Sequence, residues 1–132
     1  MLRDVQVAAL RAAMLQRLAR EIALELRRDH NEEKTIASLN DGDLLHAVES
    51  ALARGGEFAL NTDSDLRALA TLVVCHGRDL DAPWVQKRLC DERVTMPADR
   101  LRLTIAESER RRRVEAHNEA QRRRFARREA ES

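Results

Sequence analysis

Two arginine clusters near the C-terminus are the residues whose types and spacing most clearly predict a binding function. They comprise Arg110, Arg111, Arg112 and Arg113, and then Arg122, Arg123 and Arg124. Clustered guanidinium groups bind the carboxylates of an acidic protein surface or the phosphates of nucleic acid. Phe125 follows the second cluster directly, and an aromatic side chain with a cationic rim has the composition of a protein-binding hot spot. We therefore predict that both clusters and Phe125 contact a partner.

Glutamates interleaved with these arginines indicate which partner is favoured. The segment from Glu107 to Ser132 contains nine arginines and six glutamates, a net charge of +3, whereas the whole chain carries only +1. The glutamates would repel phosphates, and the segment lacks the aromatic series on which single strands stack. An acidic protein partner is therefore favoured over nucleic acid, although a solvated helix without a partner remains an alternative.

The histidines and cysteines do not have the spacing of a metal or catalytic site. The four histidines are His30, His46, His76 and His117. Cys75, His76 and Cys90 come nearest to a zinc set, but adjacent side chains on a helix diverge by roughly 100° and a fourth ligand is missing. The same divergence argues against a Cys–His nucleophile pair. We expect no metal and no cofactor.

Asp79 and Asp81 are the remaining candidates for chemistry. Two carboxylates this close could bind a cation or act as an acid and a base. We favour the interpretation that Asp81 caps the helix beginning near Pro83 and that Asp79 is solvated. No glycine-rich loop follows a strand to bind phosphate. We therefore expect a protein that is not an enzyme.

The elements that must position these residues are predicted to be helices. The apolar residues are mostly Leu, Ala and Val, and aromatic residues make up only 2% of the chain, a composition that favours helices over strands. Apolar residues at three- and four-residue spacing predict a first amphipathic helix over about residues 2–29. Its apolar face comprises Val7, Leu10, Met14, Leu18, Ile22 and Leu26.

Three shorter helices follow a polar connector at residues 30–34. The second begins with Asn40 or Asp41 as its cap and ends at Gly55-Gly56, where a glycine can adopt the left-handed conformation. Thr62 is predicted to cap the third, which ends at Gly77. The fourth begins at Asp81-Ala82-Pro83 and buries either Trp84 or Val85 together with Leu89.

The last helix is predicted from Thr95-Met96-Pro97 to about residue 130. Leu101, Leu103 and Ile105 can pack on the body, whereas sizeable apolar residues are rare after Glu107. Glu–Arg pairs four residues apart can keep this second half helical without a core. We predict an all-α fold of about five helices, with a compact helical body over residues 1–106 and a protruding helical extension over 107–132. Trp84 is expected at a partner-binding surface of the body.

No apolar segment of signal-peptide type opens the sequence. The longest uncharged stretch, from Ala68 to Gly77, is about half of what a membrane span requires. We therefore expect a cytoplasmic protein that does not cross a membrane. Its two cysteines should then be reduced and packed as small hydrophobes.

The middle of the chain resembles a group of small helical proteins encoded beside type VI secretion effector genes in proteobacteria. The motifs are Leu52-Ala53-Arg54-Gly55-Gly56, Asp65-Leu66 and Gly77-Arg78-Asp79-Leu80-Asp81-Ala82-Pro83-Trp84, with Gln6 at the start of the first helix. The resemblance covers about residues 1–105. It departs at Gly55, where the group has an aromatic residue, and at Asp29-His30, where it has an aromatic-proline pair, and the extension after Ala106 lies outside the pattern.

The resemblance implies an accessory role in loading or stabilising an effector, as an adaptor or co-chaperone, with no catalytic residues. Three further hypotheses stay open. The chain could be an immunity protein that binds a cognate toxin, a nucleic-acid-binding protein, or a homo-oligomeric scaffold built by pairing the long helices.

Overall fold

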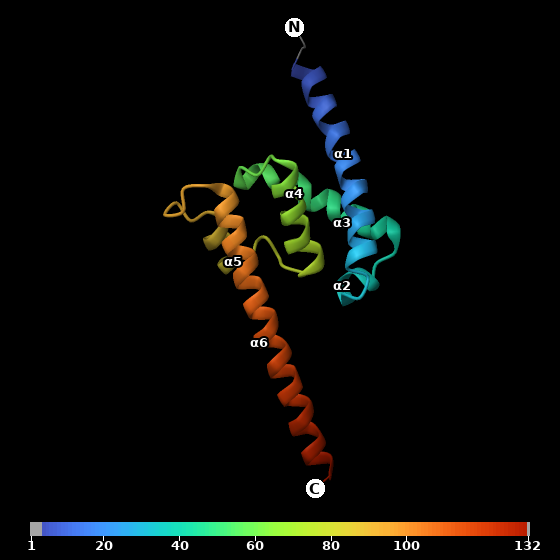
Figure 1. Cartoon of the computed structure of the whole chain (residues 1–132), viewed down its shortest axis with the longest axis vertical. Coiled ribbons are helices and arrows are strands. Elements are labelled where there is room, and N and C mark those ends of the chain that lie inside the picture. The colour runs from blue at the N-terminus through green and yellow to red at the C-terminus, as the bar shows by residue number, and fades with distance from the viewer. Residues whose placement is uncertain (1–3, 132) are drawn as a thin grey trace.

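The computed structural model describes residues 4–131, and within them the regular secondary structure is entirely helical, with no strand. Figure 1 shows a small body from which α1 and α6 extend in opposite directions. The elements are α1 (Asp4–Asp29), α2 (Lys34–Ala37), α3 (Asp41–Ala53), η1 (Gly55–Phe58), α4 (Asp63–Ala70), η2 (Thr71–Cys75), α5 (Pro83–Leu89) and α6 (Pro97–Glu131). The predicted all-α fold with a long C-terminal helix is confirmed. Leu2, where the first helix was predicted to begin, lies outside the described residues.

Two apolar clusters form the core and share the helix made by α4 and η2. The first cluster joins this helix to the second half of α1, to α2 and to α3, through Ile22, Leu26, Ile36, Leu44 and Val48 among others. The second joins it to η1, α5 and α6, through Phe58, Leu69, Leu72, Leu80, Val85, Leu89 and Leu101. The helix from α4 to η2 is therefore the central element of the body.

Two of the predicted helix starts are confirmed by their capping hydrogen bonds. The side chain of Asn40 accepts a hydrogen bond from the backbone N–H of Asp43 at 2.8 Å, so Asn40 rather than Asp41 caps α3. Thr62 accepts one from the N–H of Asp65 at 3.1 Å and caps α4. Each bond satisfies an N–H that the first helical turn leaves without a backbone partner.

The predicted left-handed glycine at the end of α3 is wrong. The chain continues from α3 through Arg54 into η1, and the left-handed residue is Ala59, with φ of 56°. Gly55 is required for a different reason: a Cβ atom there would lie 2.6 Å from Leu66 Cδ2 and 2.9 Å from the carbonyl oxygen of Leu60. Gly77, where the third helix was predicted to end, adopts the left-handed conformation, with φ of 64°.

Replacing Gly55 with alanine is expected to lower the free energy of unfolding by about 1–3 kcal/mol, because the added methyl group overlaps the backbone of Leu60. The matched control is Gly56→Ala, since a Cβ at Gly56 meets no atom within 4 Å. Urea unfolding of the two variants measures the difference. Equal stability of both variants would contradict the close approach at Gly55.

The sequence did not predict α2 or the wider turn η2. α2 lies just after the predicted polar connector and buries Ile36 fully against the core. η2 is a single π-helical turn in which the backbone N–H of His76 donates to the carbonyl of Thr71 at 3.0 Å. Such a turn inserts one residue into the helical repeat, so the side chains after it are rotated relative to a regular helix.

α6 packs on the body with its first half only. Leu101 is buried in the second cluster, and Thr104 and Ser108 on the same face of α6 are buried as well. Leu103, which the sequence placed on the body, is 44% exposed. Every residue from 113 to 131 is exposed. α6 is nevertheless one uninterrupted helix. Its first half is packed on the body, and its exposed second half extends from the body into solvent (Figure 1).

Candidate protein-binding surfaces

Trp84 lies where α5 meets α6, between two guanidinium groups. The guanidinium carbon of Arg111 lies 4.1 Å from the centre of the Trp84 ring, and that of Arg78 lies 5.6 Å away. Val85, not Trp84, is the residue of this turn that enters the core. Cation–π contacts of this kind stabilise the junction by roughly 0.5–1 kcal/mol each at a partly exposed site. Trp84 therefore helps to hold α6 within the chain itself.

The first arginine cluster is divided between the body and solvent. Arg111 covers Trp84, and Arg112 donates to Glu33 at 2.6 Å, which joins α6 to the segment before α2. Arg110 and Arg113 are exposed. Consecutive residues of a helix point about 100° apart, so only part of a run of four can face a neighbouring element. The structure therefore leaves two of the four predicted contact residues directed to solvent.

Ser108, which the sequence did not single out, is the polar centre of the contact between α6 and the loop that follows η2. Arg78 donates to both the hydroxyl and the carbonyl oxygen of Ser108, at 2.8 and 3.0 Å, and to Glu115 at 3.1 Å. His76 Nδ1 lies 2.8 Å from the same hydroxyl. These bonds extend the attachment of α6 to Glu115, past the predicted boundary between body and extension at residues 106 and 107. A signal was present in the sequence: Thr104 and Ser108 are one turn apart on the face of Leu101.

His76 gives the attachment of α6 a pH dependence. Burial lowers the pKa of His76 below its ordinary value of 6.5, and the nearby Arg112 and Arg78 lower it further, against the opposing effect of Glu109 and Glu33. The neutral ring is therefore the form that the folded protein favours.

The folded protein is expected to lose stability as the pH falls below about 6.5, because the unfolded chain then binds a proton on His76 that the folded chain does not. Above that pH the contribution of His76 to the free energy of unfolding is fully present. Urea unfolding at several pH values across about pH 5–7 measures how this free energy changes. In the control His76→Gln the fall in stability due to His76 should disappear. If the free energy of unfolding of that variant depended on pH as in the unaltered chain, His76 would not be the group responsible.

The second arginine cluster and Phe125 lie on the projecting half of α6. Phe125 is 65% exposed, and Arg122 and Arg124 are exposed beside it. Arg123 donates to Glu119 at 2.7 Å, one of the predicted pairs four residues apart. Phe125 follows Arg111 by fourteen residues, about 21 Å along the helix. The predicted contact residues therefore form two separate surfaces, one at Trp84 and one around Phe125.

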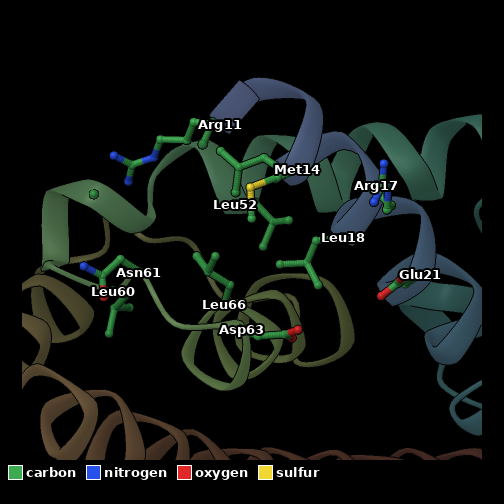
Figure 2. Close-up of a pocket in the computed structure, with 13 residues that line it drawn as sticks. Arg11, Met14, Arg17, Leu18, Glu21, Leu52, Leu60, Asn61, Asp63 and Leu66 are labelled. Atoms are coloured by element: carbon green, nitrogen blue, oxygen red, sulfur yellow. The ribbon is translucent and has the colours of Figure 1, made fainter. Parts of the chain in front are cut away.

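A third surface is an apolar groove of about 670 Å³ beside α1. Figure 2 shows Met14 and Leu18 of α1 converging with Leu52 of α3 and Leu66 of α4 over this groove. Met14 is 68% exposed, and the apolar face continues toward the N-terminus through Leu10 and Val7, both at least half exposed. The periodicity identified this face correctly. It could not show that only the part of α1 from about Leu15 onward reaches the body.

The two aspartates between η2 and α5 hold the loop together. Asp81 accepts a hydrogen bond from Arg54 at 2.8 Å, and Asp79 accepts one from the backbone N–H of Asp81 at 2.9 Å. The predicted cap at Asp81 is wrong, because Ala82 occupies the cap position of α5 and has no side-chain oxygen. Across residues 4–131, no three His, Cys, Asp or Glu side chains lie together as a metal site would require.

The two cysteines differ in accessibility. Cys75 is buried in the first core cluster, and this burial raises the pKa of its thiol to about 11. Cys90, which was expected to be packed as well, is exposed because it follows the last turn of α5.

In the native protein we therefore expect one thiol to react rapidly with Ellman's reagent and two after unfolding, since the reaction needs an accessible thiolate. In a Cys90→Ser variant the native protein should be almost unreactive. Rapid reaction of two thiols before unfolding would contradict the burial of Cys75.

No known protein family, curated protein or solved structure matches this chain. Within the described part of the chain, none of the helices is both long enough and apolar enough to cross a bilayer.

Proposed function

We propose that the protein is a binding module without catalytic activity, which acts as an adaptor or co-chaperone for a type VI secretion effector. The observation that carries the proposal is the exposed half of α6, a preformed helix that presents Phe125 and Arg122 to solvent. Because the helix is already ordered, a partner that binds it does not have to offset the conformational entropy of folding it. The resemblance of residues 1–105 to proteins encoded beside effector genes supports the choice of partner.

The charge distribution supports a protein with an acidic groove as the partner. Around Phe125 the arginines outnumber the glutamates, but Glu115 and Glu119 lie between the two arginine clusters and Glu129 follows the last arginine. An interface of this type depends on one buried aromatic anchor with ion pairs at its rim. Arg111 and Arg112 are already occupied by Trp84 and Glu33, which reduces the number of guanidinium groups that could contact phosphates.

The test is direct binding between the purified full-length chain and the effector encoded beside its gene, measured by calorimetry. Phe125→Ala is expected to weaken binding roughly 30-fold or more, the effect of removing a hot-spot aromatic. The control is Leu24→Ala, which removes an equally exposed apolar side chain from α1. The proposal fails if the effector does not bind, or if the two variants bind equally well.

Nuclease treatment separates this function from nucleic-acid binding. Binding to the effector should be unchanged after the treatment. Affinity for duplex DNA, if present, should fall with about one log–log unit of salt per phosphate contacted.

A further inference from the structure

The groove beside α1 is a binding site that the chain leaves unfilled. The apolar part of its lining comes from Met14, Leu15, Leu18, Leu52, Leu60 and Leu66, and charged and polar side chains border it. These side chains come from α1, from the end of α3, from the turn after η1 and from α4, so the groove is a permanent feature of the packing of the body. Its size and lining suit one large apolar side chain together with part of the helix that presents it.

One end of the groove carries an excess of negative charge. Arg67 of α4 binds three carboxylates at once, those of Glu21, Glu25 and Asp63. One guanidinium neutralises only one of them, so the group keeps a net charge of −2. Glu21 and Asp63 line the groove together with Arg17, and Figure 2 places Arg17 on the side of Glu21 and Arg11 at the other end. With Arg17 included, the excess at the first end is −1, so the groove is apolar in the middle, weakly acidic at one end and basic at the other.

The exposed end of α6 has the complementary order of side chains on a single face. Arg122 lies three residues before Phe125 and Glu129 lies four residues after it, so all three share one side of the helix. Asn118, Gln121 and Ala126 complete this face. Along the helix this face is therefore basic at Arg122, apolar at Phe125 and acidic at Glu129. Phe125 is its only large apolar side chain.

The chain cannot fill its own groove. Figure 1 shows the projecting halves of α1 and α6 at opposite ends of the molecule, with the body between them. α6 is straight, uninterrupted and fixed to the body through Ser108 and Glu115, so its end cannot turn back. The end of α6 in a second copy meets no such restriction.

We propose that the end of α6 from one copy of this chain binds in the α1 groove of another copy, with Phe125 beside Leu18. In the antiparallel orientation Arg122 approaches Glu21, because both residues lie three positions, about 4.5 Å, from the Phe125–Leu18 contact. Glu129 then lies toward Met14 and Arg11. The copy that donates its α6 end keeps a free groove and the copy that receives it keeps a free α6 end, so the interface is heterologous and generates chains or closed rings. This assembly goes beyond the binding of an effector.

The first measurement is the mass of the purified full-length protein by sedimentation velocity over a range of concentrations. A single helix in a groove buries less surface than a stable dimer requires, so association should appear only at high micromolar concentrations. Met14→Glu and Phe125→Ala should each give a monomer at every concentration. Leu24→Glu and Val114→Ala are the controls, because they change exposed apolar residues outside the groove and away from Phe125, and they should associate like the unaltered chain.

Mixing the two blocked variants is the decisive experiment. Met14→Glu retains an intact α6 end and Phe125→Ala retains an intact groove, so an equimolar mixture should form a heterodimer and nothing larger. Charge reversal tests the orientation: Arg11→Glu and Glu129→Arg should each weaken association, and the double variant should restore it.

A monomeric wild-type chain at all concentrations would overturn the proposal. So would association of Phe125→Ala at wild-type levels, which would indicate a symmetric contact between two α1 helices. A mixture of the blocked variants that stays monomeric would overturn it as well. All these measurements use the purified chain alone, so they are independent of whether an effector binds.

Discussion

Replacing Leu101 with alanine is expected to lower the free energy of unfolding by about 3–4 kcal/mol, the largest effect of any single substitution that we predict. Leu101 is 1% exposed and is the apolar residue of α6 that enters the second core cluster. Removing its side chain loses the transfer free energy of the buried carbons and leaves a cavity between α6 and the helix formed by α4 and η2. Thermal and urea unfolding measure the loss.

The matched control for this prediction is Leu103→Ala, the same substitution two residues further along α6. Leu103 is 44% exposed, so its loss should cost about 0.5 kcal/mol or less. If the two variants lost similar stability, the face of α6 that packs on the body would have to differ from the one described.

Replacing Arg78 with alanine is expected to lower the free energy of unfolding by about 2–3 kcal/mol and to loosen α6 from the loop that follows η2. Arg78 makes two charge-assisted hydrogen bonds to Ser108 and one to Glu115, and its guanidinium lies over Trp84. Hydrogen bonds to charged groups contribute more than neutral ones, and their loss leaves buried oxygen atoms of Ser108 with fewer donors. Because Trp84 is the only tryptophan of the chain, its fluorescence should change along with the stability.

Two controls accompany the Arg78 variant. Arg78→Lys keeps the positive charge but cannot form both bonds to Ser108, so it should be intermediate. Arg113→Ala removes an exposed arginine from α6 and should change neither stability nor fluorescence. An Arg78→Ala variant as stable as Arg113→Ala would show that the Ser108 contact contributes nothing to the docking of α6.

The sequence predicted the elements better than the contacts between them. The helix class, the caps at Asn40 and Thr62, the end of the third helix at Gly77 and the length of α6 all follow from local patterns, because local backbone preferences decide them. The role of Gly55 was misjudged because it depends on Leu60 and Leu66, which local pattern does not place beside it. The same holds for Asp81, which pairs with Arg54 from another part of the chain.

For the candidate surfaces, too, the sequence predicted what depends on local composition and not what depends on contacts between elements. Composition identified Phe125 and the second arginine cluster as exposed residues, and the structure agrees. The reason is that a mostly polar helix has no apolar face to bury. It could not separate Arg111 and Arg112, which contact the body, from Arg110 and Arg113, which do not. The groove could not be predicted at all, because it is formed by three helices and depends on how far along α1 the body extends.

The opposite projections of α1 and α6 also determine how the molecule behaves hydrodynamically. α6 alone is about 52 Å long, whereas a compact protein of this length has a radius of gyration of about 14 Å. A single copy must therefore experience more friction than a sphere of its mass and elute early from a sizing column. Elution volume would suggest an oligomer even for the monomer, so the number of copies has to come from sedimentation or light scattering. The same length lets one copy reach a partner well beyond the radius of its own body.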